Sequence, residues 1–538
     1  MKPAQGSPDS SKSEHGSSIA RSAGLVSLMV ACSRVLGLIR EQVFAGLFGA
    51  SAATDAFQAA FRAPNLLRDL FAEGALSTAF VTTFSQKIER EGTDSAWRLA
   101  SKVATLTVVF MSGITLLGIL FAPQMIGFLA PGFDPEKKDL TILLTRIMFP
   151  FILLVSLAAL AMGMLNARKV FGVPAMASSF FNLGSIMGGV SIGYLLDPEF
   201  GEQALIGLAI GTLIGGLLQL GVQLPSLRKV GFRFAPDFQW RDPGVIRVLQ
   251  LMGPAVIAAS AVQVNVMVNT IFASYLEDGA ITWLNYAFRL MQLPLGLFGV
   301  ALGIVTLPLL SRVAAHGVTE EFNRTLAKSL RFACFLSIPS ALGLIFLAEP
   351  IISLLFERGR FTPEDTLATA GALRFYALGL VAYSAIKILA PAFYTINMQN
   401  APMYVSLASI GVNAVINWIL IFQLGWGHQA LALSTGCVAA INVGVLYYLM
   451  RRRIGKLVGE VLFKGLGRLL LATIPLMLVC LGFQGWLADL GSVSEFERIF
   501  RVGVVVSCGA LAFMVGAWLA KVEELQDFIG VVSRRLRR

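Results

Sequence analysis

Residues 33–84 read SRVLGLIREQVFAGLFGASAATDAFQAAFRAPNLLRDLFAEGALSTAFVTTF, a strongly apolar text that is interrupted by charged residues. The charged residues of this stretch are Arg34, Arg40, Glu41, Asp55, Arg62, Arg68, Asp69 and Glu73. An ionisable side chain inside a bilayer costs about 2.5 to 3.5 kcal/mol on insertion scales, so such side chains usually face one another or a water-filled cavity. We therefore interpret the stretch as two membrane-spanning helices that carry functional charges.

The composition extends this interpretation to the whole chain. Of its 538 residues, 56% are hydrophobic and 14% are charged. Globular proteins average about 45 to 50% apolar and about 25% charged residues. Apolar runs of about 20 residues, the length that a spanning helix needs, recur from end to end. The sequence therefore predicts an all-α integral protein of an inner-type membrane.

The apolar runs predict fourteen transmembrane helices. Their expected centres lie near residues 35, 70, 110, 152, 183, 213, 260, 298, 336, 382, 412, 438, 475 and 508. Basic residues gather in the loops after even-numbered spans, for example Arg168 with Lys169 and the run 451–453. Such loops stay in the cytoplasm, so we expect both termini to be cytoplasmic. Because the net charge of +11 comes from these loops, it indicates no nucleic-acid partner.

The sequence has no residue pattern that is typical of a catalytic or metal site. The five cysteines lie singly in apolar runs, and the three histidines lie apart in tails or loops. Neither set has the spacing of a metal site or of a disulfide framework. The paired aspartates expected of an enzyme that acts on polyprenyl pyrophosphates are also missing. We therefore predict a transporter that is not an enzyme and that holds no cofactor or metal.

The chain repeats itself after about 227 residues. At this shift Ala60-Phe61-Arg62 falls on Ala287-Phe288-Arg289, and Phe71 falls on Phe298. Six spans separate the copies, so the sequence predicts two parallel six-helix lobes around a central cavity, a transporter layout, plus two added C-terminal helices. The predicted domains are a disordered cytoplasmic tail (1–20), an N-lobe (21–228), a C-lobe (244–453), two further spans (464–520) and a basic cytoplasmic tail (521–538).

Span two carries a polar stripe that we predict to be functional. At 100° per residue, one face within roughly 80° holds Asp55, Gln58, Arg62, Asn65, Asp69 and Glu73. A kink at Pro64 would rotate the part that contains Arg68 relative to the first half. The carboxylates Asp55 and Glu73 have two open functional roles: they hold arginines in place while the site is empty, or they titrate and couple transport to protons.

Three arginines from both lobes suit a phosphate-bearing substrate. We select Arg40, Arg68 and Arg289, because a guanidinium binds phosphate oxygens through two parallel hydrogen bonds and stays charged when buried. The alternative is that these charges form structural salt bridges or snorkel to the membrane surface. A separate asparagine set offers oxygens to a cation, but interhelical hydrogen bonding is the favoured interpretation. This set is Asn265, Asn269, Asn413 and Asn417.

The motifs SRVLGLIRE, FGASAATDAF, APNLLRDLFAEGALSTAFV, LAPGF and LAPAFY resemble the MurJ (MviN) family of lipid II flippases over residues 22–520. This family belongs to the multidrug/oligosaccharidyl-lipid/polysaccharide (MOP) exporter superfamily. The resemblance implies fourteen helices in two lobes around a central cavity. It also implies alternating access that moves lipid II, the undecaprenyl-pyrophosphate-linked peptidoglycan precursor, from the cytoplasmic to the periplasmic leaflet for cell-wall synthesis.

The resemblance also implies roles for individual residues. The substrate-binding set would be Arg34, Arg40, Asn65, Arg68 and Arg289, and the gating or coupling carboxylates would be Glu41, Asp55 and Glu73. The last two spans would form a groove for the polyprenyl tail. Expected partners are lipid II, membrane lipids and proteins of cell division or peptidoglycan synthesis, and the driving force, membrane potential or an ion gradient, is left open. The alternative function is another exporter of the superfamily, for polyprenyl-linked O-antigen or polysaccharide, or for drugs.

Overall fold

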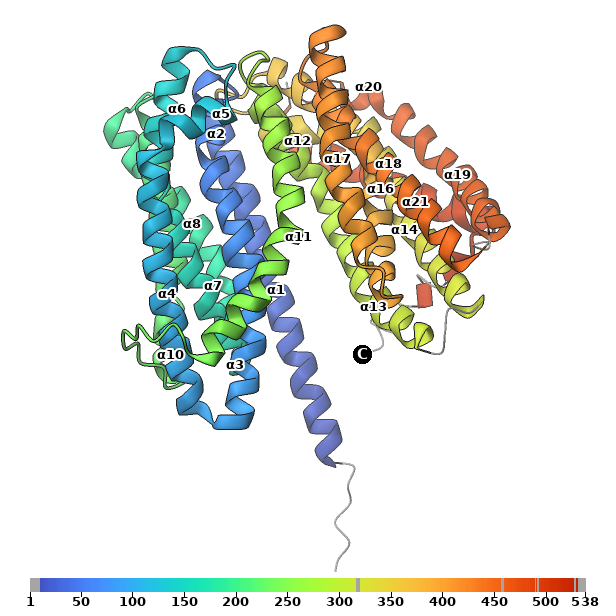
Figure 1. Cartoon of the computed structure of the whole chain (residues 1–538). Coiled ribbons are helices and arrows are strands. Elements are labelled where there is room, and N and C mark those ends of the chain that lie inside the picture. Colours follow the sequence, from blue (N-terminus) through green and yellow to red (C-terminus); the bar gives the residue numbers. More distant parts are fainter. Residues whose placement is uncertain are drawn as a thin grey trace, which may run out of the picture. The chain divides into compact units, whose positions relative to one another are not determined.

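The computed structural model describes residues 10–315, 320–455, 459–488, 490, 493–526 and 529–530. Every secondary-structure element along these residues is a helix, so the predicted all-α class is confirmed (Figure 1). Contacts divide the chain into two compact units. Unit 1 comprises the chain up to Phe48, Ala56–Leu129 and Phe133–Gln263, and unit 2 comprises Gly49–Asp55, Ala130–Gly132 and the chain from Val264 onward.

Unit 1 is built on a core in which aromatic side chains stack. Its helices are α1 (Ser10–Phe48), α2 (Ala52–Leu67), the π-helix η1 (Arg68–Leu76), α3 (Ser77–Glu91), α4 (Thr93–Leu120), α5 (Ala122–Leu129), α6 (Pro135–Met148), α7 (Phe151–Ala167), α8 (Gly172–Leu196), α9 (Ala204–Gly221), α10 (Leu224–Lys229) and the first part of α11 (Pro243–Ala273). Phe80 and Phe84 of α3 stack, and the ring of Trp97 on α4 packs at a tilt against Phe84. Val245 and Val248 of α11 join this core.

Helix α11 belongs to both compact units. The division between the units falls within α11, after Gln263, and the lobes predicted over residues 21–228 and 244–453 stay a prediction. The physical reason is that the first turns of α11 bury Val245 and Val248 in the core of unit 1. The basic loop of residues 230–242 therefore resembles a linker in the sequence, but the helix that follows it packs into unit 1.

Unit 2 contains the rest of α11 and all later helices. They are α12 (Ala280–Pro294), the π-helix η2 (Leu295–Gly299), α13 (Val300–Ala314), α14 (Glu320–Phe346), α15 (Ala348–Phe356), α16 (Pro363–Thr395), α17 (Asn400–Trp418), the π-helix η3 (Ile419–Gln423), α18 (Gln429–Ile454), α19 (Gly459–Gly482), α20 (Gln484–Leu487) and α21 (Glu495–Leu519). One core joins α13, α14, α16 and α18, and a second joins α14, α19 and α21.

Ten helical segments of the described chain are long and apolar enough to cross a membrane. All fourteen predicted centres lie in long helical segments, but four of these segments are not among the ten. These four are α1, α2–η1–α3, α11 and α12–η2–α13. They hold all eight predicted site residues.

The helix bounds follow the predicted repeat. Adding 227 to residues 93 and 120 of α4 gives 320 and 347, and α14 runs from Glu320 to Phe346. Adding 227 to residues 52 and 67 of α2 gives 279 and 294, and α12 runs from Ala280 to Pro294. Helix α6 starts at an Asp134–Pro135 cap, and α16 starts 228 residues after it at a Thr362–Pro363 cap. The sparse residue matches therefore correspond to a shared order of elements.

The N-terminal segment is more helical than predicted. The tail that we predicted to be disordered over residues 1–20 is helical from Ser10, two residues after the last proline before α1. Extending an existing helix adds one hydrogen bond per residue, so α1 continues into a polar segment that could not start a helix alone. Residues 1–9 and most of the predicted basic tail, 531–538, lie outside the described residues.

Helices α8 and α9 approach each other backbone to backbone. A Cβ atom on Gly207 would lie 2.2 Å from the backbone nitrogen of Gly193, and one on Gly211 would lie 2.4 Å from that of Gly189. Small residues at a spacing of four allow such approach between helices in membranes. The run Gly207, Gly211 and Gly215 is therefore a packing surface within unit 1.

Candidate substrate site

The second predicted span changes its helix type at the candidate site. Pro64 lies inside α2 and has no N–H for the helix ladder, and the α-helix gives way to the π-helix η1 at Arg68. The predicted polar stripe therefore follows one helical wheel only as far as Leu67. The corresponding helix of unit 2 changes in the same way, because Pro294 ends α12 directly before η2. Single π-helical turns occur frequently at functional sites.

Arg68 is held by a carboxylate next to it. Its Nε and Nη2 atoms donate to Oδ1 of Asp69 at 3.1 and 2.9 Å, and the two side chains are 23% and 28% exposed. The other carboxylate oxygen of Asp69 accepts from Nε2 of Gln263 on α11 at 3.1 Å. Gln263 was not among the predicted site residues, because a single amide within an apolar run is its only sign in the sequence. The three residues form a half-buried polar group within unit 1.

Arg40 is also paired with its neighbour. Its Nη2 lies 2.6 Å from Oε1 of Glu41, which is only 4% exposed, and its guanidinium lies 5.3 Å from the ring centre of Phe181 on α8. Arg34, six residues before Arg40 on the same helix, is exposed. The long side chain of Arg40 reaches sideways across the 100° between adjacent residues. Helix α8 contributes Phe181, which we had not selected.

Asp55 binds the start of α12, and both lie in unit 2. Its Oδ2 accepts from the backbone N–H of Gly279 at 2.8 Å, and its Oδ1 accepts from the N–H and the hydroxyl of Thr282 at 2.9 and 2.7 Å. Asp55 is 1% exposed. A carboxylate at a helix N-terminus satisfies free N–H groups and interacts favourably with the helix dipole. Asp55 and Thr282 occupy the same position of the two repeats, since 55 plus 227 is 282.

The remaining predicted site residues are Arg289, Asn65 and Glu73. Arg289 is an exposed residue of α12 in unit 2, whereas Arg40 and Arg68 belong to unit 1, so their convergence stays a prediction. Phe288 packs against the ring of Tyr376 on α16, at 5.3 Å between centres. Asn65 is half-buried beside Pro64, and Glu73 lies in η1 with a side chain outside the described part of the chain.

The predicted asparagine contacts form within unit 2. Oδ1 of Asn269 on α11 accepts from the amide nitrogens of Asn413 and Asn417 on α17 at 2.7 and 2.9 Å. The amide nitrogen of Asn269 donates to Oγ1 of Thr435 at 3.1 Å. These bonds confirm the interhelical interpretation for three of the four asparagines. The fourth, Asn265, has a buried Oδ1 that accepts no hydrogen bond from the described residues.

An apolar groove of about 430 Å³ lies beside the added helices of unit 2. Its walls come mainly from α14, α19 and α21, and Phe335, Pro339, Leu476 and Phe513 are among the residues that line it. Such a surface has almost no polar group to offer a headgroup. It is suited to a hydrocarbon chain.

Comparisons with known proteins agree over most of the chain. A family model described as Lipid II flippase MurJ matches residues 44–500. The Lipid II flippase MurJ of Burkholderia cenocepacia is 39% identical over 428 residues, which cover 78% of this chain and 81% of the relative. The Probable lipid II flippase MurJ of Bdellovibrio bacteriovorus is 34% identical over 507 residues, or 93% of this chain and 95% of the relative.

Solved structures share the fold. The structure titled Lipid II flippase MurJ, inward closed conformation, has a TM-score of 0.71 and 26% sequence identity, and the match covers 96% of this chain and all of that one. An inward-facing multidrug resistance MATE family transporter of the MOP superfamily has a TM-score of 0.66 over 78% of this chain and 94% of its own. Its identity is 14%, so this second likeness concerns the fold alone.

Proposed function

This chain belongs to the MurJ family of lipid II flippases, and we propose that it moves lipid II from the cytoplasmic to the periplasmic leaflet of the inner membrane by alternating access. The observation that carries the proposal is the family match over residues 44–500. The multi-pass helical architecture supports it, because a flippase must surround a polar headgroup inside the bilayer. The proposed activity is transport without covalent chemistry.

We further propose that the chain spans the membrane fourteen times, as two six-helix lobes and two added spans with cytoplasmic termini. The ten apolar helices and the four other long segments, α1, α2–η1–α3, α11 and α12–η2–α13, together supply fourteen helical segments in the described chain. The shared order of elements at a shift of 227 residues supports two repeats of parallel orientation. The site residues then lie on the first two spans of each repeat.

In this proposal Arg40, Arg68 and Arg289 bind the pyrophosphate. Glu41 and Asp69 occupy the guanidiniums of Arg40 and Arg68 while substrate is absent. A pyrophosphate carries more negative charge than either carboxylate and offers several oxygens for paired hydrogen bonds. Exchange of carboxylate for pyrophosphate would keep each guanidinium paired with an anion, both with and without substrate. Arg34 and Asn65 are assigned to the border of this site.

Asp55 is proposed to be a gating residue. It is the last residue of the segment 49–55 that packs in unit 2, and the chain enters unit 1 at Ala56. Breaking its three hydrogen bonds to Gly279 and Thr282 would release this segment from α12. A ligand shifts a conformational equilibrium only by its differential affinity for the two states. Pyrophosphate binding would supply this difference in affinity between the two conformations. Glu73, in η1, is proposed to be the coupling residue.

The apolar groove is proposed to hold the polyprenyl tail. Its lining by α14, α19 and α21 matches the role that the family resemblance implies for the last two spans. The tail would stay in hydrocarbon surroundings while the headgroup crosses. Return of the empty carrier is proposed to use the membrane potential, which supplies about 2.3 kcal/mol per charge per 100 mV, or an ion gradient.

Growth restoration tests the proposal. A bacterium depleted of its own flippase should grow when it expresses this chain, and should fail to grow with Arg40→Ala, Arg68→Ala or Arg289→Ala at equal membrane levels. Arg90→Ala, which changes an exposed arginine of α3, is the control and should restore growth. Undiminished growth with all three site variants would show that the pyrophosphate site is wrong. Failure of the unchanged chain, at normal membrane levels, would contradict the proposed activity.

A further inference from the structure

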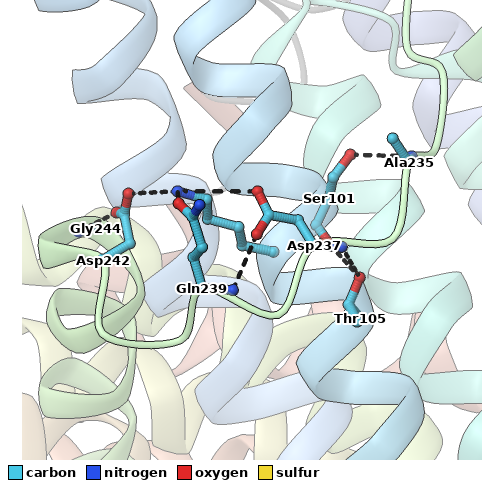
Figure 2. A network of polar contacts seen from close by, with 8 residues as sticks. Ser101, Thr105, Ala235, Asp237, Gln239, Asp242 and Gly244 are labelled. Atoms are coloured by element: carbon cyan, nitrogen blue, oxygen red, sulfur yellow. Dashed lines mark hydrogen bonds and ion pairs between the residues drawn. The ribbon is translucent and has the colours of Figure 1, made fainter.

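A strap of residues 230–242 lies across α4 in unit 1. It connects α10 to α11 and has no regular secondary structure. Lys102 of α4 is buried beneath the strap and donates to Oε1 of Gln239 at 3.1 Å and to Oδ2 of Asp242 at 2.8 Å. The backbone N–H of Asp237 donates to Oγ1 of Thr105 at 3.1 Å. Figure 2 shows these contacts, which fix the strap to the surface of one helix.

The contacts place the strap at the edge of the hydrocarbon layer. Lys102 is the last charged residue of α4, and no Asp, Glu, Lys or Arg occurs from residue 103 to residue 133. The helix therefore enters the apolar part of the bilayer directly after its contact with the strap. This is the side of the basic loops, which the sequence predicts to be cytoplasmic.

The strap exposes aromatic and basic side chains together. Phe234 is 51% exposed and Phe238 is 65% exposed. Arg233 and Arg241 on the same strap are also exposed or partly exposed. Exposed phenylalanine is unfavourable in water, but aromatic side chains are suited to the boundary between headgroups and hydrocarbon. The combination indicates contact with lipid headgroups instead of with bulk solvent.

A pocket of about 640 Å³ opens between α4 and the strap. Arg98 lies one turn before Lys102 on α4 and lines the pocket together with Arg233, Trp97, Ser101 and Phe238. The acidic residue in the lining is Asp237, whose carboxylate lies 4.0 Å from Nζ of Lys102. Lys102 is shared between Asp237 and Asp242, at 4.0 and 2.8 Å. The three basic side chains Arg98, Lys102 and Arg233 still outnumber these two carboxylates by one, which leaves the pocket attractive to an anion. Two guanidiniums match a phosphate group in charge and in hydrogen-bond geometry.

We propose that this pocket binds the phosphate of an anionic phospholipid in the leaflet on the side of the basic loops. Arg98 and Arg233 contact the phosphate, and Phe238 and Phe234 lie among the neighbouring headgroups and the first acyl carbons. The strap leads directly into α11, whose first turns pack in unit 1 and which continues into unit 2 after Gln263. A bound lipid would therefore stabilise the base of the helix that connects the two units.

The test compares two charge-matched double variants of the full-length chain. Arg98→Gln with Arg233→Gln removes two charges from the pocket, whereas Arg228→Gln with Lys229→Gln removes two charges from α10, outside the pocket lining. Binding of phosphatidylglycerol and phosphatidylcholine to the purified protein is measured by native mass spectrometry over a lipid titration. Thermal unfolding in detergent checks that both variants fold. The changed arginines are exposed, so we expect unchanged unfolding.

The unchanged chain should bind phosphatidylglycerol more tightly than phosphatidylcholine. The pocket variant should weaken phosphatidylglycerol binding about tenfold, the change expected for one lost charge-assisted hydrogen bond, and the α10 variant should weaken it much less. Equal binding of the two lipids by the unchanged chain would overturn the proposal. An equal loss in both variants would also overturn it, because general attraction to basic loops would then explain the binding. Neither readout depends on transport of lipid II.

Discussion

At the scale of residues, two arginines of unit 1 are each paired with the carboxylate that directly follows in the chain. Arg40 pairs with Glu41 and Arg68 pairs with Asp69. The sequence predicted the arginines from the cost of their burial, but it could not identify these pairs. A helical wheel separates adjacent residues by 100°, and Gln263, the third member of the Arg68 group, is 194 residues from Asp69. Contacts of this range depend on tertiary packing.

Replacement of Arg68 by lysine tests whether the geometry of the guanidinium matters. Lysine keeps the charge but cannot donate two parallel hydrogen bonds to one anion. We expect Arg68→Lys to reduce the rate of lipid II transport about tenfold, as for the loss of one charge-assisted hydrogen bond. Arg90→Lys is the matched control. Equal transport by both variants would mean that Arg68 contributes only charge.

Replacement of Asp55 by asparagine tests the gating contact. In the asparagine variant, an NH₂ group replaces one of the carboxylate oxygens that accept from Gly279 and Thr282, so two donors would face each other. We expect a loss of about 1 to 3 kcal/mol of stability and a lower midpoint of thermal unfolding. Asp139→Asn changes an exposed aspartate of α6 and should leave the midpoint unchanged. If Asp55→Asn unfolds at the temperature of the unchanged chain, the contact does not stabilise this conformation.

At the scale of elements, the sequence predicted the helices well because each one needs a long apolar run. It did not predict the strap or the three π-helices of the described chain. The π-helix η1 follows a proline whose effect depends on local packing, and the strap is held by Lys102, which the sequence presented as one more basic residue of a cytoplasmic loop. Polar contacts between a loop and a helix have no periodicity that would reveal them.

The close packing of α8 and α9 gives an element-scale prediction. Gly207→Ala would place a methyl group against the backbone of Gly193, and overpacking of this kind costs about 1 to 3 kcal/mol. We expect a lower midpoint of thermal unfolding. Gly221→Ala is the control, because a Cβ atom there has no described neighbour within 4 Å. Equal midpoints would show that the two helices separate easily.

The strap gives a pH prediction. Burial would raise the pKa of Asp242, but hydrogen bonds from Lys102 and the backbone amide of Gly244 outweigh it and hold this pKa below its ordinary value of 3.8. A lowered pKa in the folded state contributes stability above the ordinary pKa, and this stability is lost as the pH falls through the folded value. The unfolding midpoint should therefore decrease more steeply from about pH 5 to about pH 3 in the unchanged chain than in Asp242→Asn. Parallel pH curves would contradict the account.

At the scale of the whole molecule, the repeat was the most informative feature of the sequence. A few matches at a shift of 227 residues anticipated the bounds of α12 and α14, and the same shift relates Asp55 to Thr282. Family membership follows from similarity over residues 44–500. The meeting of arginines from both repeats remains a prediction, because the sequence gives their order along the chain and the two units are described separately.

Transport of lipid II by the purified protein tests the central claim most directly. Fluorescent lipid II is reconstituted into vesicles with the unchanged chain, with Arg68→Ala or without protein, and a membrane-impermeant quencher is added outside. We predict that the unchanged chain brings label from the inner leaflet to the quencher, whereas Arg68→Ala and empty vesicles lose only the label of the outer leaflet. Quenching by the unchanged chain at the level of empty vesicles would contradict the account.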